Sequence, residues 1–187
     1  DDLYVYLVAA DLTVLDAVKL TPRAGLPSMQ RFPLTGTEWY HAVVPTRDAA
    51  NAPEIREAVV INEIMYRPPS SHSAGEYVEL FNRSSATVNL AGWRMAGGIN
   101  YTFPVGAVLA PGGYAIVASQ PTYMTTHYPG ITQVFGPLAG TLRNAGELIR
   151  LEDERGNLAD SVHYESGGQW PTAAGGEGSS VELIHPS

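Results

Sequence analysis

Short apolar runs, separated by glycine and proline at close intervals, make up most of the sequence. No stretch of a dozen residues carries the 3.6-residue apolar period of an amphipathic helix. From residue 59 onward the runs are rich in Val, Ile, Leu, Tyr and Phe, several of which favour strands. Short strands with turn signals between them are typical of an all-β sandwich or barrel, so the pattern predicts an all-β fold.

We expect about nine strands in this part of the chain, close to the count of an immunoglobulin-like sandwich. They are residues 59–66, 76–82, 88–95, 101–103, 113–118, 132–135, 147–152, 158–164 and 180–184. Residues 113–118 are apolar on both faces, which predicts a central, buried strand. In residues 76–82, Tyr77, Glu79 and Phe81 should share one face, because side chains alternate along a strand.

The N-terminal part of the chain has a different character. Residues 3–8 and 13–20 can each form a strand, and residues 39–44 are a second short run after a loop-like stretch rich in Pro and Gly. A polar, Ala-rich linker follows. A strand pair alone has too little surface to bury. We therefore predict a sandwich domain over residues 58–187, preceded in residues 1–57 by a β-rich extension or partial domain whose independence stays open.

Two residues have clear structural assignments. Trp93 lies in a predicted strand, and its ring is expected to fill the core between two facing sheets. The five residues between the strands at 147–152 and 158–164 should form a hairpin loop in which Gly156 takes a positive φ.

The acidic residues offer candidate chemistry. Glu63, Glu76 and Glu79 could form a calcium site or an acid/base pair. Their spacing matches no calcium-loop pattern, and a buried glutamate satisfied by an arginine, with Arg94 as the expected partner, explains them as well. Turn chemistry likewise explains the acidic loop at 152–160, although a weak calcium site there stays open. We predict no catalytic, cofactor-binding or metal-binding residues.

Composition narrows the range of functions. A net charge of −8 repels phosphate backbones and argues against a broad nucleic-acid surface. The chain has no cysteine, which excludes disulfides and thiol catalysis, and no apolar run approaches the roughly 20 residues that cross a bilayer. The five histidines lack zinc spacing, and hydrolase and nucleotide motifs are absent. Because the chain begins with Asp1 and shows no signal peptide, we expect a fragment of a larger protein.

Aromatic residues in or near predicted loops give one candidate ligand patch, which consists of Tyr123, His127, Tyr128 and Trp170. Tyr164 is placed among the same loop-flanking aromatics. Exposed aromatics beside flexible loops can bind sugars or peptides, and the alternative is that they cap the ends of the core. The connection at 120–130 is long for a β protein, which favours a functional loop.

The string VVINEIMYRPP, followed by GEYVELFNRSSATVNLAGWRM, resembles the opening of the lamin tail domain in its bacterial form. Three further segments follow in the family's order: YTFPVGAVLAPGGYAIVA, FGPLAGTLRNAGELIRLEDERGNLADSVHYE and GSSVELIHP. The resemblance covers roughly residues 58–187. It implies an immunoglobulin-like fold without catalytic residues, and bacterial modules of this kind tend to lie in secreted or surface proteins.

We therefore expect a non-catalytic interaction or structural module of a larger bacterial protein, secreted or in the cell envelope, that binds or scaffolds a protein partner. A carbohydrate-binding module attached to a surface enzyme is the main alternative, although fold alone is a weak argument for it. A metal-dependent hydrolase and a nucleic-acid-binding module are the others. Edge strands, above all residues 3–8 and 13–20, could also pair with a sheet edge within or between chains.

Overall fold

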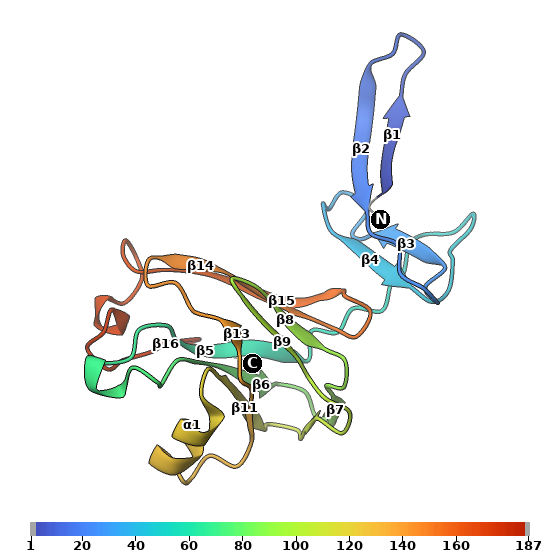
Figure 1. The fold of residues 1–187 in the computed structure, drawn as a ribbon. Helices are drawn as coiled ribbons and strands as arrows, with labels where there is room; N and C mark the ends of the chain where they lie inside the picture. Colours follow the sequence, from blue (N-terminus) through green and yellow to red (C-terminus); the bar gives the residue numbers. More distant parts are fainter. Residues whose placement is uncertain (1–2, 186–187) are drawn as a thin grey trace. The chain divides into compact units, whose positions relative to one another are not determined.

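The computed structural model describes residues 3–185 and divides the chain into two compact units. One unit is Asp1–Ile55 and the other is Arg56–Ser187. Strands provide most of the regular structure in both units (Figure 1). Each unit is described by itself below.

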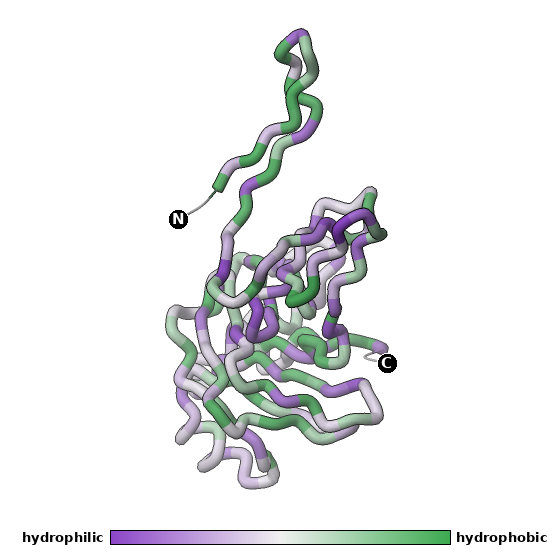
Figure 2. Tube along the Cα trace, turned by 90° about the vertical axis from the view of Figure 1, so that its right-hand side faces the viewer, coloured by the Kyte–Doolittle hydropathy of each residue, from purple (hydrophilic) through white to green (hydrophobic). Residues whose placement is uncertain are grey.

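The first unit contains two antiparallel hairpins. In one, β1 (Leu3–Val8) pairs with β2 (Val14–Leu20), and in the other, β3 (Ser28–Arg31) pairs with β4 (Trp39–Ala42). The strands predicted at 3–8, 13–20 and 39–44 are confirmed. Figure 2 colours most of the β1–β2 hairpin as hydrophobic.

Strand β3 lies in a stretch for which the sequence predicts a loop, and that prediction is wrong. Gln30, in the middle of β3, is buried and satisfies both ends of its side-chain amide. Its Nε2 donates to the Val44 carbonyl at 2.9 Å, and its Oε1 accepts from the Ala52 amide at 3.1 Å. These partners lie 14 and 22 residues further along the chain, so no local pattern reveals the strand.

The second unit is a sandwich of two five-stranded sheets. The β5 sheet has the order β12-β11-β6-β5-β16, and the β14 sheet has the order β13-β9-β8-β14-β15. The strands of the β5 sheet are β5 (Val59–Met65), β6 (Tyr77–Asn82), β11 (Tyr114–Ala118), β12 (Val134–Phe135) and β16 (Val181–Glu182). Those of the β14 sheet are β8 (Arg94–Gly97), β9 (Ile99–Thr102), β13 (Ala139–Gly140), β14 (Gly146–Glu152) and β15 (Leu158–Glu165). The remaining elements are β7 (Val88–Asn89) paired with β10 (Val108–Leu109), helix α1 (Pro121–His127), and the 3-10 turns η1 (Ser70–His72) and η2 (Thr172–Ala174).

The core between the sheets is apolar and continuous. Trp93 is fully buried within it, as the sequence predicts. Val78 and Leu80 of β6 point into this core, while Tyr77 and Glu79 occupy the other face and are only partly buried. The alternation read from the sequence is therefore confirmed. It leaves one face of β6 available for chemistry outside the core.

Turn predictions also hold. Gly156 closes the hairpin between β14 and β15 with a φ of +82°. The predicted strand at 88–95 is instead two strands, β7 and β8, because Gly92 between them takes a φ of +81°. Strand β11 is confirmed as buried and lies between β12 and β6.

Helix α1 is the main departure from the sequence prediction, which has a loop at 120–130. Pro121 stands in the first turn, where its missing N–H costs no hydrogen bond. Met124 is buried against Ile116 and Ala118 of β11. Seven residues are too few to show an apolar period, and such a short helix depends on tertiary packing. Over residues 3–185, no helix has the length and apolar character needed to cross a membrane.

Candidate functional site

The outer face of the β5 sheet is covered over only part of its width. Helix α1 packs over β11 and β12, where Met124, Ile116 and Ala118 form a second, smaller core with Val134 and Ile131 at its margin. Figure 1 shows α1 beside β11, at one end of this sheet. The helix leaves the outer face of β5 and β16 uncovered.

Three glutamates lie side by side on this uncovered part. Strand register places Glu182 of β16 opposite Glu63 of β5, and Glu63 opposite Glu79 of β6. The row continues with Ile116 of β11, which pairs with Glu79. We call Glu63, Glu79 and Glu182 the acidic row. It ends where the apolar surface under α1 begins.

A groove of about 530 Å³ runs along this boundary. One wall is apolar and comes from Ile116, Met124 and Ile131. Glu63, Glu182 and Tyr77 supply polar lining, while Glu79 lines a second cavity that shares Ile116 and Ile131 with the groove. The other lining residues come from the loop around η1, from the end of α1 and from the C-terminal segment: Met65, Pro68, Pro69, His72, Gly75, Tyr128, Gly178, Ser179 and Ser180. The groove thus combines an apolar wall with carboxylates.

The acidic row has hydrogen-bond donors but no cationic partner. The Asn62 Nδ2 donates to the Glu79 Oε1 at 2.9 Å, and the Tyr77 hydroxyl donates to the Glu63 Oε1. Within residues 3–185, no lysine or arginine forms an ion pair with any of the three carboxylates. Like charges directly opposite each other on a sheet are destabilising.

The electrostatics follow from this arrangement. Burial raises the pKa of Glu79, and the charges of Glu63 and Glu182 raise it further, against the lowering effect of the Asn62 hydrogen bond. Burial and the bond to Glu63 raise the pKa of the Tyr77 hydroxyl, so Tyr77 stays protonated and acts as a donor. The site therefore favours a ligand that brings positive charge.

Aromatic and imidazole rings form the rim of the groove near α1. The His72 Nδ1 lies 2.5 Å from the Tyr123 hydroxyl, and the Tyr123 ring stacks on His127 with centroids 4.0 Å apart. These contacts link η1 to α1. Tyr128, which follows the helix, lines the groove and is 47% exposed.

The predicted ligand patch is therefore only partly assembled. Tyr123, His127 and Tyr128 lie together on and just after α1. Trp170 packs against the main core and lines another cavity, of about 80 Å³, that shares Glu63 and Glu182 with the groove. Whether Tyr123, His127 and Tyr128 bind a ligand stays a prediction.

The placement of Tyr164 among the loop aromatics is wrong. Tyr164 lies in β15, is fully buried and stacks on Tyr66 with centroids 4.9 Å apart. Its hydroxyl donates to the Arg143 carbonyl at 2.9 Å. The alternation of β15 carries this residue into the core, so it has a structural role.

The candidate carboxylate cluster is also revised. Glu63 and Glu79 are neighbours, whereas Glu76 precedes β6. Burial raises the pKa of Glu76, and the nearby charge of Glu147 raises it further. Sequence reasoning missed Glu182, because a two-residue strand more than 100 positions away supplies it. The polar residue in the closing SVELI run was the only available signal.

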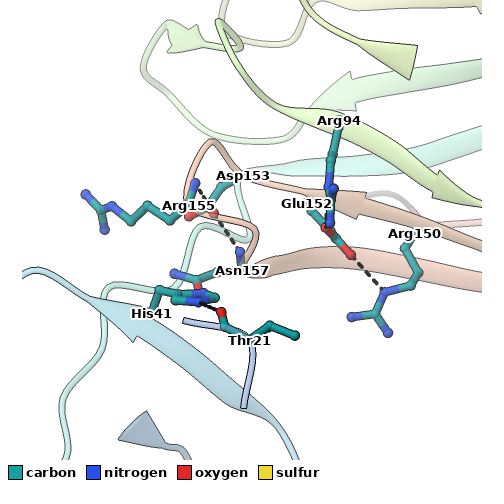
Figure 3. Close-up of polar contacts among 8 residues, drawn as sticks. All are labelled: Thr21, His41, Arg94, Arg150, Glu152, Asp153, Arg155 and Asn157. Atoms are coloured by element: carbon teal, nitrogen blue, oxygen red, sulfur yellow. Dashed lines mark hydrogen bonds and ion pairs between the residues drawn. The ribbon is translucent and has the colours of Figure 1, made fainter. Parts of the chain in front are cut away.

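The sequence predicts that Arg94 pairs with a glutamate of the candidate cluster, and this prediction is wrong. Arg94 pairs with Glu152. Its Nη2 lies 2.5 Å from the Glu152 Oε2, and the Arg150 Nε lies 3.2 Å from the other carboxylate oxygen (Figure 3). Register explains the correction, since Arg94 of β8 is directly opposite Glu152 of β14 on the outer face of the other sheet.

The acidic loop between β14 and β15 follows turn chemistry. The Asp153 Oδ1 accepts from the backbone amides of Arg155 at 2.9 Å and Asn157 at 2.8 Å. Figure 3 shows these side chains. Within the first unit, the His41 Nε2 lies 2.8 Å from the Thr21 carbonyl oxygen. In the part of the chain that the structure describes, no three His, Asp or Glu side chains gather as a metal site would require.

The comparisons with known proteins agree with this architecture. The profile of the Lamin Tail Domain matches residues 53–166, which is more than half of the chain. No curated protein sequence matches significantly. The matched range contains both sheets except β16, together with the groove wall and two glutamates of the acidic row. The chain belongs to the lamin tail domain family of non-catalytic, immunoglobulin-like modules.

Proposed function

We propose that this protein is an interaction module of a larger bacterial protein, secreted or on the cell surface, and that its groove binds a basic segment of a protein partner. The observation that carries the proposal is the acidic row, three adjacent carboxylates without a cationic partner beside an apolar wall. The secreted or surface location rests on the family resemblance. No catalytic role is proposed, since the family is non-enzymatic.

An arginine or lysine side chain matches both sides of the groove. Its aliphatic stem can lie along Ile116, Met124 and Ile131 while its charged end reaches the acidic row. The rings of Tyr77 and Tyr128 offer faces for a cation. A bound cation would also relieve the repulsion among the three carboxylates, so binding gains on both counts.

A peptide of alternating arginine and leucine tests this proposal. Its matched control carries citrulline, which keeps the shape of arginine without its charge. We expect the arginine peptide to bind more tightly, and the double substitution Glu63→Gln with Glu182→Gln to weaken it about tenfold, since charge-assisted bonds are lost. Fluorescence anisotropy measures both affinities.

General attraction to an acidic protein must be separated from recognition by the groove. Glu165→Gln removes one exposed carboxylate on β15 and should leave the peptide affinity unchanged. Equal binding of the arginine and citrulline peptides, or an equal loss with Glu165→Gln, would contradict the proposal.

A carbohydrate ligand is the second candidate, and the exposed ring of Tyr128 beside carboxylates is what favours it. Sugars pack on aromatic rings and accept hydrogen bonds from, or donate them to, nearby polar groups. A glycan array would then give signals that Tyr128→Ala abolishes and that do not depend on basic groups.

A further inference from the structure

The β1–β2 hairpin of the first unit exposes an unusual amount of apolar surface. Every residue of β1 is exposed, including Leu3 at 50%, Val5 at 44% and Leu7 at 61%. Contiguous exposed apolar surface marks an interaction site in soluble proteins, and an isolated two-stranded hairpin is marginally stable in water. The hairpin therefore has the properties of an interface element.

Its two faces differ in character. Register places Leu3 opposite Leu20, Val5 opposite Val18 and Leu7 opposite Asp16, so one face is aliphatic except for Asp16. The other face carries Tyr4 and Tyr6, with the Lys19 ammonium 6.0 Å from the centre of the Tyr4 ring. Any partner strand that extends this sheet must match an aliphatic face and a tyrosine face at once.

The outer edge of β1 has no paired strand and carries no charge or proline that would block pairing. Among the described strands, β1 pairs with β2 alone. Natural edge strands usually carry a charge, a proline or a bulge that prevents pairing with another chain. Strand β2 carries Asp16 and Lys19, and Asp16 forms an ion pair with Arg31 at 2.5 Å. Strand β1 has no charged residue, proline or glycine, and its pairing with β2 is regular from Leu3 to Leu7, with a register shift only between Leu7 and Val8.

The sequence of β1 is also symmetric. Residues 3–7 read LYVYL in either direction. If two copies of β1 pair antiparallel around Val5, Leu3 lies opposite Leu7 of the second copy, and Tyr4 lies opposite Tyr6. The aliphatic faces of the two copies then coincide, as do the tyrosine faces, because each pair joins residues of the same parity.

We propose that two copies of this chain associate through β1, with Val5 on a two-fold axis, to form a four-stranded antiparallel sheet in the order β2-β1-β1-β2. Two-fold interfaces place the same surface of both subunits in contact and so require self-complementarity, which the palindrome provides. A different partner protein would require no such symmetry. The pairing gives backbone partners to the open edge of β1 and joins the aliphatic faces of the two hairpins.

Charge substitutions on the axis test the proposal in the full chain. Val5→Lys and Val5→Glu each place two like charges opposite each other, so each variant alone should lose the dimer that sedimentation detects for the unmodified chain. An equimolar mixture should recover a dimer, because lysine then faces glutamate. Val18→Lys, on the same face of β2 but away from the axis, is the matched control and should retain the dimer.

A disulfide crosslink gives a second readout. Because the chain has no native cysteine, any disulfide must form through the introduced residue. Val5→Cys should oxidise to a covalent dimer, since directly opposed residues on antiparallel strands bring their Cβ atoms close enough for a disulfide. Leu15→Cys, exposed on β2, should not. A chain that stays monomeric at every concentration, or a mixture of charge variants that does not recover the dimer, would overturn the proposal.

Discussion

The two outer faces of the sandwich differ in whether their carboxylates have cationic partners. On the β14 sheet, Glu152 is nearly buried between Arg94 and Arg150, which neutralise it and bond to both its oxygens. On the β5 sheet, Glu79 is half-buried and meets two more glutamates instead of an arginine. The same fold thus contains one balanced and one unbalanced acidic surface.

This difference separates structural from functional acids. A carboxylate that is paired with arginines stabilises its own face and needs no ligand to neutralise its charge. An unbalanced row costs stability, and sequences tend to break local rules of this kind where a site requires it. The groove beside the acidic row agrees with that interpretation.

The largest expected effect comes from the core on which both faces depend. Trp93→Ala should lower the free energy of unfolding by about 4 kcal/mol, because it empties a fully buried site of the largest side chain. Chemical denaturation followed by circular dichroism measures the loss. Tyr6→Ala, exposed on the hairpin of the first unit, is the control, and an equal loss there would show that Trp93 does not anchor the sandwich.

The next effect concerns the entry to β14. Gly146→Ala should cost about 3 kcal/mol, because Gly146 has a φ of +107° and an added Cβ would collide with the Tyr164 carbonyl oxygen. Gly112 precedes β11 with a φ of +63° and open space around it. Gly112→Ala should therefore cost only about 1 kcal/mol. Similar losses at the two glycines would show that backbone strain alone, and not the collision, sets the cost.

Local sequence patterns predicted those parts of the fold that depend on neighbouring residues. The alternation in β6, the burial of Trp93 and the turn at Gly156 follow from spacing and residue type. Helix α1 could not be predicted in this way, because the contact between Met124 and Ile116 stabilises it.

The candidate site was only partly predictable for a related reason. Glu63 and Glu79 stand out as acids in apolar runs, but their alignment depends on a register shift between Ile61 and Glu63. Glu182 joins them only through the pairing of β16 with β5. Burial of Trp170 against the core is likewise a tertiary effect. Strand register, which the sequence does not display, decides which acids become neighbours.

A smaller effect is expected on the balanced face. Glu152→Gln removes the charge that Arg94 and Arg150 share, and it should cost about 1 kcal/mol, a value held down because both arginines are partly exposed to solvent. Salt should shrink the difference, since it screens the lost attraction. Unfolding titrations at low and high salt measure it, and a stabilised variant would refute the balanced description of this face.

The smallest effect has the opposite sign and lies on the unbalanced face. Glu79→Gln retains an oxygen that can accept from Asn62 but removes the repulsion from Glu63 and Glu182. It should raise the free energy of unfolding by about 0.5 kcal/mol at neutral pH.

The pH dependence of that gain follows from the direction of the pKa shift. The pKa of Glu79 is raised in the folded chain above its ordinary value of 4.5, so the charged form destabilises the fold at neutral pH. As the pH falls through the raised pKa, the folded chain takes up the proton first, and the advantage of Glu79→Gln should shrink until it disappears below about 4.5. Glu165→Gln, exposed and outside the acidic row, should show no such trend. A gain for Glu79→Gln that persisted unchanged in acid would mean that side-chain shape, and not uncompensated charge, distinguishes the two faces.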